Sequence, residues 1–465
     1  MKSSLQISKI DYWVYGISLA LCFLLFKQSD LTLTNNASFA YLYGHFSDFY
    51  DYNRPLFTGN NYLPVFYWIF ALWNIPLKLL GFAPEITSQT WMLSTPIQTI
   101  WSKLLLAICF YSSIKMVGEI SEQISKEFIP PKSSPEYISP KYLFASSPIA
   151  IFAVFIFSGY DIFGVFFTLL GLRSYFLKGF KRFVLWFSIA ISFKYFAAFI
   201  FLPLVLIIEK RVAYLVLYGV CGLAFSAIQF WMYWHSKAFH FGIFGMINEK
   251  TGAHGISLRF IIANLVYVVM CAYLYFSKFQ FGESVYAWGK RAIFSGVLAY
   301  ALLFSWTLWH PQWLILITPF ICLSFLFIRM QKTMLTIEIL GYVGFAVFCI
   351  NNWVGNVDNT MLYGGVFSEF LPHTELLASD LIGRQWMPLS RTLLYASLYA
   401  PLLLEFAQSA VLWLRSGALS APGISEVTLD DSRLCNAKKE KLLFTARFLL
   451  ATYFFIAVSM LCIVN

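Results

Sequence analysis

Three titratable side chains lie at the ends or tips of apolar segments, where they are placed to do chemistry. Asp30 follows the apolar stretch 11–27, and Lys194 interrupts the apolar run 183–209. His310 precedes a proline in a segment rich in tryptophan. A positioned carboxylate can take a proton from an attacking hydroxyl, and Lys or His can stabilise the charge that builds on a departing phosphate. These residue types therefore suit the transfer of a group, such as a sugar, from a lipid phosphate to a hydroxyl.

Each of these residues also has a structural interpretation. Lys194 could extend outward to phosphate headgroups, and His310 could belong to an interfacial aromatic belt with its neighbouring tryptophans. Asp30 could be a polar helix end. Asp161 lies at the expected turn of a hairpin over residues 143–178, where it could cap the following helix, and capping is compatible with contact to a substrate. The residue types alone leave both interpretations open.

Two further carboxylates, Asp48 and Asp51, belong to the polar and aromatic segment 28–61. Their spacing of three places them on one face of a helix. The neighbouring aromatic residues suit an amphipathic helix lying in the membrane interface, whose solvated face these acids would form. We therefore favour a surface role for Asp48 and Asp51, and keep them as alternative candidates for a catalytic acid or base.

The composition identifies the kind of scaffold that must position these residues. The chain has 465 residues, of which 59% are hydrophobic and 12% charged, and its mean hydropathy is +0.68. An average soluble domain is about 45–50% apolar and about 25% charged. These values exclude a soluble enzyme, a disordered chain and a disulfide scaffold, and the apolar runs lack the alternation of a membrane β-barrel. We expect an all-α polytopic membrane protein.

Apolar runs recur along the whole chain and predict about 13 transmembrane helices. With the basic clusters on the cytoplasmic side, the entire net charge of +10 falls on that side, as the positive-inside rule requires. The charge therefore orients the protein and implies no nucleic-acid partner. The parity of crossings makes 62–82 a re-entrant or interfacial segment and 99–117 a crossing. The large loops 28–61, 235–258 and 352–387 then face the outside.

Several short motifs follow one another in a fixed order within roughly residues 11–330. They are Asp30, Asn61-Tyr62-Leu63-Pro64, Ser102-Lys103, Pro148 with Gly159 and Asp161, Lys194-Tyr195, and His310-Pro311. This order resembles the GT-C superfamily of membrane glycosyltransferases, closest to the branch that uses polyprenyl- or dolichyl-phosphate-mannose. Two positions depart from the family pattern. Tyr160 stands where Gln or Asn is usual, and Thr32 stands where a second acid would fall, which argues against dependence on a metal.

The resemblance implies a GT-C-like fold and an inverting hexosyltransferase, such as a mannosyltransferase, with Asp30 as general base. The residues expected to hold the donor phosphate are Lys194, His310 and Arg259. The residues expected in the substrate pocket are Asp161, Tyr160 and Tyr62. The expected substrates are a polyprenyl-phosphate-sugar donor and a glycan, glycolipid or protein acceptor, with no metal and no further cofactor. We expect a location in the bacterial plasma membrane, among membrane lipids, with the site on the outer, periplasmic side.

Two other classes of function remain open. A transporter or flippase for a lipid-linked sugar would show internal symmetry and titratable groups on both sides of the membrane. An O-antigen polymerase or ligase would carry a large outer loop rich in arginine, whereas the arginines here are scattered. For the main hypothesis, residues 1–330 form the catalytic transmembrane module, and residues 331–465 form C-terminal transmembrane helices.

Overall fold

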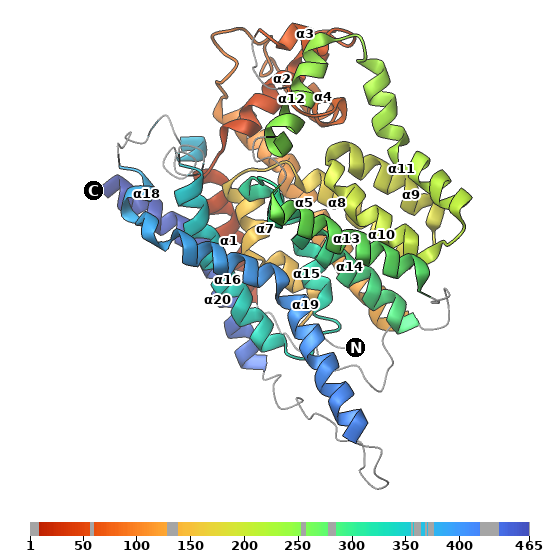
Figure 1. Ribbon diagram of the computed structural model, residues 1–465. Helices are drawn as coiled ribbons and strands as arrows, with labels where there is room; N and C mark the ends of the chain where they lie inside the picture. Colours follow the sequence, from red (N-terminus) through yellow and green to blue (C-terminus); the bar gives the residue numbers. More distant parts are fainter. Residues whose placement is uncertain are drawn as a thin grey trace.

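The regular secondary structure in the computed structural model is entirely helical over the residues that it describes (Figure 1). The described residues are 9–55, 60–127, 138–252, 257–277, 285–354, 357, 364–367, 370, 376–418 and 437–464. The elements of the N-terminal half are α1 (Lys9–Leu25), α2 (Ser29–Leu42), α3 (Phe49–Asn53), α4 (Pro64–Leu79), α5 (Pro96–Glu127), α6 (Pro140–Ala145), α7 (Pro148–Ile151), the π-helical turn η1 (Phe152–Ile156), α8 (Ile162–Phe176), α9 (Phe180–Phe193), η2 (Tyr195–Ala197), α10 (Ala198–Ile208) and α11 (Val212–Met232). Those of the C-terminal half are α12 (Lys237–Gly252), α13 (Leu258–Phe276), α14 (Val285–Trp306), η3 (Pro311–Leu316), α15 (Thr318–Ser324), α16 (Gln331–Asn352), η4 (Gly365–Phe367), α18 (Ala378–Leu381), η5 (Arg384–Trp386), α19 (Met387–Ala418) and α20 (Ala437–Val464).

Five of the described helices are long and apolar enough to cross a membrane. They lie in α5, α11, α13, α16 and α20, and the bent pair of α1 and α2 would add a sixth. This is consistent with an integral membrane protein. The count of about 13 spans is not confirmed, because several predicted runs are apolar helices of only 10–17 residues, among them Ile162–Phe176 and Tyr195–Ile208. Hydropathy alone does not distinguish a short helix buried in protein from one that crosses lipid.

The spanning helices differ in how much of their surface the protein covers. Only 11% of the apolar window of α11 and 17% of that of α13 is buried. The corresponding windows of α5 and α16 are half buried or more. Because exposed leucines, valines and tyrosines on α11 and α13 would be unfavourable in water, these two helices form the side of the bundle suited to face lipid.

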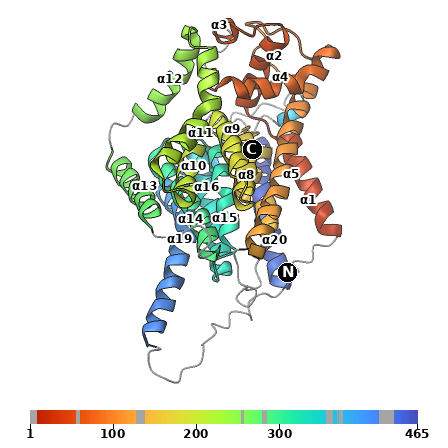
Figure 2. The same ribbon diagram turned by 90° about the vertical axis from the view of Figure 1, so that its right-hand side faces the viewer.

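At one end of the bundle, α2, α3, α4 and α12 gather into a cap (Figures 1 and 2). The cap has a hydrophobic core of its own, in which Tyr41, Phe49 and Tyr67 pack with Phe239. Its attachment to the bundle includes the side chain of Gln229 in α11, which accepts a hydrogen bond from the first turn of α4. The predictions of loops over 28–61 and 235–258 therefore need correction, because α2 and α12 are helices within them and most side chains of α2 are buried.

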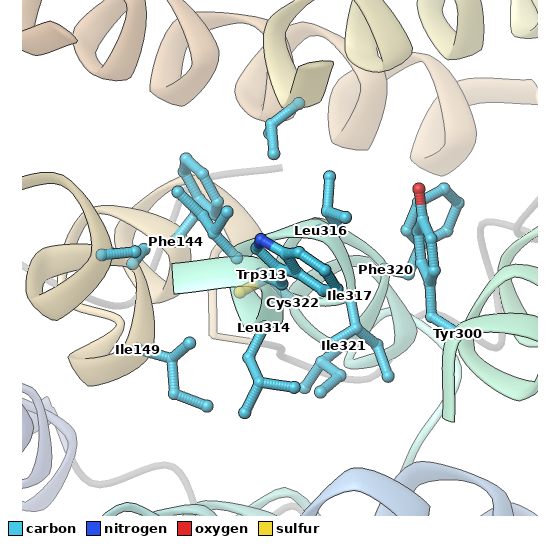
Figure 3. Close-up of a cluster of buried hydrophobic side chains, with 14 of the residues drawn as sticks. Phe144, Ile149, Tyr300, Trp313, Leu314, Leu316, Ile317, Phe320, Ile321 and Cys322 are labelled. Carbon is cyan, nitrogen blue, oxygen red and sulfur yellow. The ribbon is translucent and has the colours of Figure 1, made fainter. Parts of the chain in front are cut away.

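The centre of the bundle is the buried segment formed by η3 and α15. Every residue from Pro311 to Ser324 is buried. In Figure 3, Trp313, Leu316 and Phe320 of this segment lie among side chains from other helices, including Phe144 and Tyr300. Because neighbouring helices surround this segment, its packing fixes the position of Pro311, the residue that follows His310.

Candidate functional site

Lys194 and Asp161 form a buried ion pair between two helical hairpins. Helix α9 ends at Phe193, and Lys194 adopts an extended conformation before the chain turns into η2 and α10. Asp161 immediately precedes α8 as its N-cap residue, after the turn that follows η1. The distance from Lys194 Nζ to Asp161 Oδ1 is 2.7 Å, and the two side chains are 4% and 1% exposed. A charge pair this deeply buried is costly unless the geometry is good, so loss of either partner would leave an uncompensated charge.

The ion pair argues against two of the structural interpretations, a capping bond by Asp161 and outward extension of Lys194. The side chain of Asp161 makes no capping hydrogen bond to α8, although its charge still faces the positive end of that helix. Lys194 does not extend outward to headgroups, because its ammonium is buried against Asp161. Both side chains therefore point toward each other across the gap between hairpins.

Aromatic rings enclose the ammonium of Lys194. Its Nζ lies 4.1 Å from the ring centre of Trp313, 5.3 Å from that of Tyr62 and 5.9 Å from that of Phe196. The negative faces of such rings attract a cation, and the attraction is strongest where water is excluded. Trp313 thus has a specific contact with the charged group, in addition to its place in the aromatic surroundings of the segment.

Asp30 belongs to the same cluster through two tyrosines. The tyrosines are Tyr62, whose ring faces the ammonium of Lys194, and Tyr160. The rings of these tyrosines meet edge to face, with centroids 5.3 Å apart. The hydroxyl of Thr34, one turn beyond Asp30 in α2, donates to the hydroxyl of Tyr160 at 3.0 Å. The half-buried Asp30 is thereby brought to the side of the cap that meets the turn containing Asp161.

The break between α1 and α2 explains the position of Asp30. The two helices meet at an angle of 71°, and the side chain of Gln28 accepts a hydrogen bond from the amide of Asp30. Asp30 therefore lies in the first turn of α2, where the free amides of a helix favour a carboxylate. The bend carries the chain from the bundle into the cap, so Asp30 lies at the junction of the two.

His310 reaches the cluster through Trp313. Its ring lies 5.3 Å from the Trp313 ring and 6.4 Å from that of Trp353. The turn at Gly159 packs directly against Gln312, two residues after His310, since a Cβ at Gly159 would lie 2.7 Å from Cβ of Gln312. Only glycine permits this approach, which brings the turn containing Asp161 beside the segment that follows His310.

Several buried polar atoms around the ion pair have no hydrogen-bond partner within the described part of the chain. They are Ser158 Oγ, Asp161 Oδ2, Gln312 Oε1 and Trp313 Nε1. Ser158 also has a φ of 59°, a conformation that costs a residue with a side chain about 1–3 kcal/mol. Unpaired buried polar groups are rare and need an explanation, such as a bound polar ligand. The set includes both donors and acceptors, which suits a ligand with hydroxyl groups.

The remaining predicted residues lie away from this cluster. Asp48 is exposed and pairs with His45, with 3.0 Å between Nδ1 and Oδ2. Asp51 is exposed on α3 and accepts a weak hydrogen bond from the amide of Ala238. These contacts agree with the surface role that we favoured for both acids. Arg259 is exposed in the first turn of α13, and no described contact joins it to Lys194 or Asp161.

The same surface of the cap carries Tyr52, whose ring stacks on His45 with centroids 3.6 Å apart. Its hydroxyl donates to Glu85 Oε1 at 2.9 Å. Partial burial, followed by the hydrogen bond to Glu85 and the charge of Asp48, raises the pKa of Tyr52 to about 12. The hydroxyl therefore stays protonated at neutral pH and acts as a hydrogen-bond donor.

Sequence reasoning missed three residues of the cluster: Thr34, Gln312 and Trp313. Thr34 lies in the polar stretch Thr32 to Ser38, which is unusual in a buried helix, and this polarity was the available signal. Trp313 was interpreted as part of an interfacial belt.

Within the described residues, no group of three or more His, Cys, Asp and Glu side chains is placed to hold a metal ion. No protein-family model, curated protein or solved structure matches the chain.

Proposed function

We propose that the protein is an inverting glycosyltransferase that moves a sugar, in the first instance a hexose such as mannose, from a polyprenyl-phosphate donor to a hydroxyl acceptor. The observation that carries the proposal is the convergence of one half-buried carboxylate with a buried lysine and a histidine. Asp30 lies one turn before Thr34, which donates to Tyr160, and the ring of Tyr160 meets that of Tyr62. Tyr62 and Trp313 both contact the ammonium of Lys194, and Trp313 also contacts the ring of His310.

In the proposed reaction, the acceptor hydroxyl attacks the anomeric carbon as the bond from that carbon to the phosphate oxygen breaks. Asp30 takes the hydroxyl proton, as a general base. Its position in the first turn of α2, at the junction of cap and bundle, leaves it half exposed, so that an acceptor in water can reach it. The attack comes from the face opposite the leaving phosphate, and the product therefore has inverted configuration at the anomeric carbon.

The departing lipid phosphate gains negative charge, which Lys194 and His310 would stabilise. An ammonium group has three N–H donors. Asp161 engages the ammonium at 2.7 Å, which fixes the orientation of Lys194 beside the proposed position of the phosphate. The unpaired atoms of Ser158, Gln312 and Trp313 would donate to, or accept from, the hydroxyls of the sugar. Tyr62 and Tyr160 would line the pocket between the two charged groups.

The finer topology belongs to the same proposal. A GT-C-like arrangement of about 13 crossings, with the cap on the outer side of a bacterial plasma membrane, would place Asp30 on the periplasmic side. The net charge of +10 and its distribution support that orientation. Two short hairpins that end at Lys194 and Asp161 would place the phosphate site at the depth of lipid headgroups, which is where the phosphate of a polyprenyl donor lies.

The test is a transfer assay with the purified full-length protein in liposomes, supplied with polyprenyl-phosphate sugars that carry a radiolabelled hexose. We expect Asp30→Asn to abolish transfer while the protein still folds and binds the donor. The matched control is Asp48→Asn, another cap carboxylate, which should keep full activity because its partner is the surface His45. Mass spectrometry of the purified protein should detect a retained polyprenyl phosphate.

The outcomes separate the candidate classes. Full activity of Asp30→Asn would remove Asp30 as the base, and loss of activity only in Asp48→Asn or Asp51→Asn would move the base to the cap surface. Movement of the intact lipid-linked sugar between leaflets, without any bond cleavage, would replace the enzyme with a flippase. Polymerisation of a preassembled oligosaccharide unit would favour the polymerase or ligase.

A further inference from the structure

Lys103 is a buried lysine whose ammonium bonds to backbone instead of to an acid. It lies in α5, is 1% exposed, and donates to the carbonyl of Phe26 and, at 3.1 Å, to that of Phe155. Its Nζ also lies 5.1 Å from the ring centre of Phe23. Among the described residues, no Asp or Glu forms an ion pair with it. A buried cation is expensive, so two well-placed acceptors must stabilise it.

Both carbonyls are available because regular helix ends at each of them. Helix α1 ends at Leu25, and the carbonyls at the end of a helix have no intrahelical partner and carry partial negative charge. Phe155 lies in the π-helical turn η1. The amides that follow this turn, those of Phe157 and Gly159, bond to the carbonyls of Phe152 and Ala153, which leaves the carbonyl of Phe155 to accept from Lys103.

The two segments that Lys103 joins lead directly to the two carboxylates of the candidate site. Asp30 follows Phe26 after the bend between α1 and α2, and Asp161 follows Phe155 after the turn at Gly159. A second contact holds the bend from another side. Gly365 packs so closely on it that an added Cβ would lie 2.4 Å from the carbonyl oxygen of Leu24.

We infer that Lys103 is a positioning residue, whose ammonium holds the bend that carries Asp30 against the turn that carries Asp161. The part of this inference that concerns catalysis rests on the proposed function. The positional part stands on the two hydrogen bonds alone. A side chain of similar size without N–H groups would fill the same volume but leave two buried carbonyls unpaired, so the two segments would open separately from the rest of the bundle.

Hydrogen–deuterium exchange of the full-length protein in lipid nanodiscs tests the positional part. We expect Lys103→Met to accelerate amide exchange in residues 27–34 and 157–163 by about 10- to 100-fold, as loss of a hydrogen bond from a charged group implies. Exchange in α11 and α13 should not change. The control is Lys115→Met in the same helix, whose side chain is 75% exposed, and which should exchange like the wild type.

A kinetic measurement tests the catalytic part. We expect Lys103→Met to lower kcat at least about 100-fold while KM for the lipid-linked donor changes less than about threefold, because a misplaced base slows the chemical step more than it weakens binding. Lys103→Arg keeps the charge and the donors, and should recover part of kcat. Equal losses through kcat and KM in both variants would indicate general damage and overturn the positioning role.

The remaining outcomes are also decisive. Unchanged exchange in both segments, or acceleration spread evenly over all helices, overturns the inference. Local acceleration in a protein that transfers no sugar from any lipid phosphate leaves the positioning role in place and refutes the proposed function. Where Lys103→Met does not accumulate in the membrane, Lys103→Gln replaces it. Glutamine is neutral and too short to bond both carbonyls, so this variant should show faster exchange in at least one of the two segments, and wild-type exchange in both segments overturns the inference.

Discussion

The ion pair of Lys194 and Asp161 makes the sharpest prediction about stability. At 2.7 Å, two unit charges attract by about 6 kcal/mol with an effective dielectric constant of about 20. Removing each ion from water costs several kcal/mol, so the pair as a whole contributes little net stability. Removal of one partner leaves the other buried and uncompensated. We therefore expect Lys194→Met and Asp161→Asn each to lower the free energy of unfolding by about 3–5 kcal/mol.

The double variant, Lys194→Met with Asp161→Asn, is expected to unfold within about 1–2 kcal/mol of the wild type, because neither buried charge remains. Methionine keeps the contact with the ring of Trp313. Reversible unfolding in mixed micelles, monitored by tryptophan fluorescence, gives the four free energies of the cycle. The control cycle uses Lys115 and Glu119, which lie 4.0 Å apart; because Lys115 is 75% exposed, their coupling should stay below about 1 kcal/mol, while the separate bond of Glu119 to Arg173 is present in both arms that keep Glu119.

Two results would refute this reasoning. Single variants within about 1 kcal/mol of the wild type would mean that water reaches the pair and screens it. A double variant whose loss equals the sum of the two single losses would mean that the charges do not interact. If the double variant is as stable as expected but transfers no sugar, stability and chemistry are separated, and the pair is retained for the reaction.

Three further predictions concern the turn at Gly159, the connection between α10 and α11, and the cap. Gly159→Ala should lower the free energy of unfolding by about 1–3 kcal/mol, measured as above, because its Cβ would lie 2.7 Å from that of a neighbouring side chain; a neutral effect would show that the turn can move. The hydrogen bond from Arg211 lowers the pKa of Glu209 from 4.5 to about 2. This pair therefore stabilises the fold above about pH 4.5, and the stabilisation is lost as the pH falls to about 2. The apparent Tm of Arg211→Gln should fall less over this pH range than that of the wild type, and parallel Tm curves would contradict the pairing. In intact cells, a membrane-impermeant maleimide should label Phe46→Cys in the cap but not Lys181→Cys in the first turn of α9, and the reverse labelling would invert the proposed topology.

The residues of the cluster were recognisable from sequence to the extent that each breaks a local pattern. Lys194 is a cation within an apolar run, and Asp161 follows a serine and a glycine that interrupt another run. Such residues are costly in an apolar setting, so a local rule suffices to find them. Asp30 and His310 were found in the same way, at the ends of apolar segments.

What these residues contact could not be predicted in this way. The pairing of Asp161 with Lys194 joins two hairpins, and the contact of Lys194 with Trp313 joins residues far apart in the chain. Neither leaves a trace in local periodicity. For the same reason α2 was predicted as a loop, because its polar residues are buried only by contacts with the other helices of the cap. It also explains the unconfirmed count of spans, because hydropathy does not report which neighbour covers an apolar surface.

The cluster is also where the backbone of the bundle is least regular. The bend after α1, the π-helical turn η1, the positive φ of Ser158 and the extended Lys194 all lie within it. In a membrane, irregular backbone is tolerated only where protein buries it or water lines it, because lipid offers no hydrogen bonds. The amides and carbonyls freed at these breaks therefore require polar partners, and Lys103 and Gln28 are two of them. A fold built only for stability would avoid so many breaks at one place, which argues that they persist because they position Asp30 and Asp161 together.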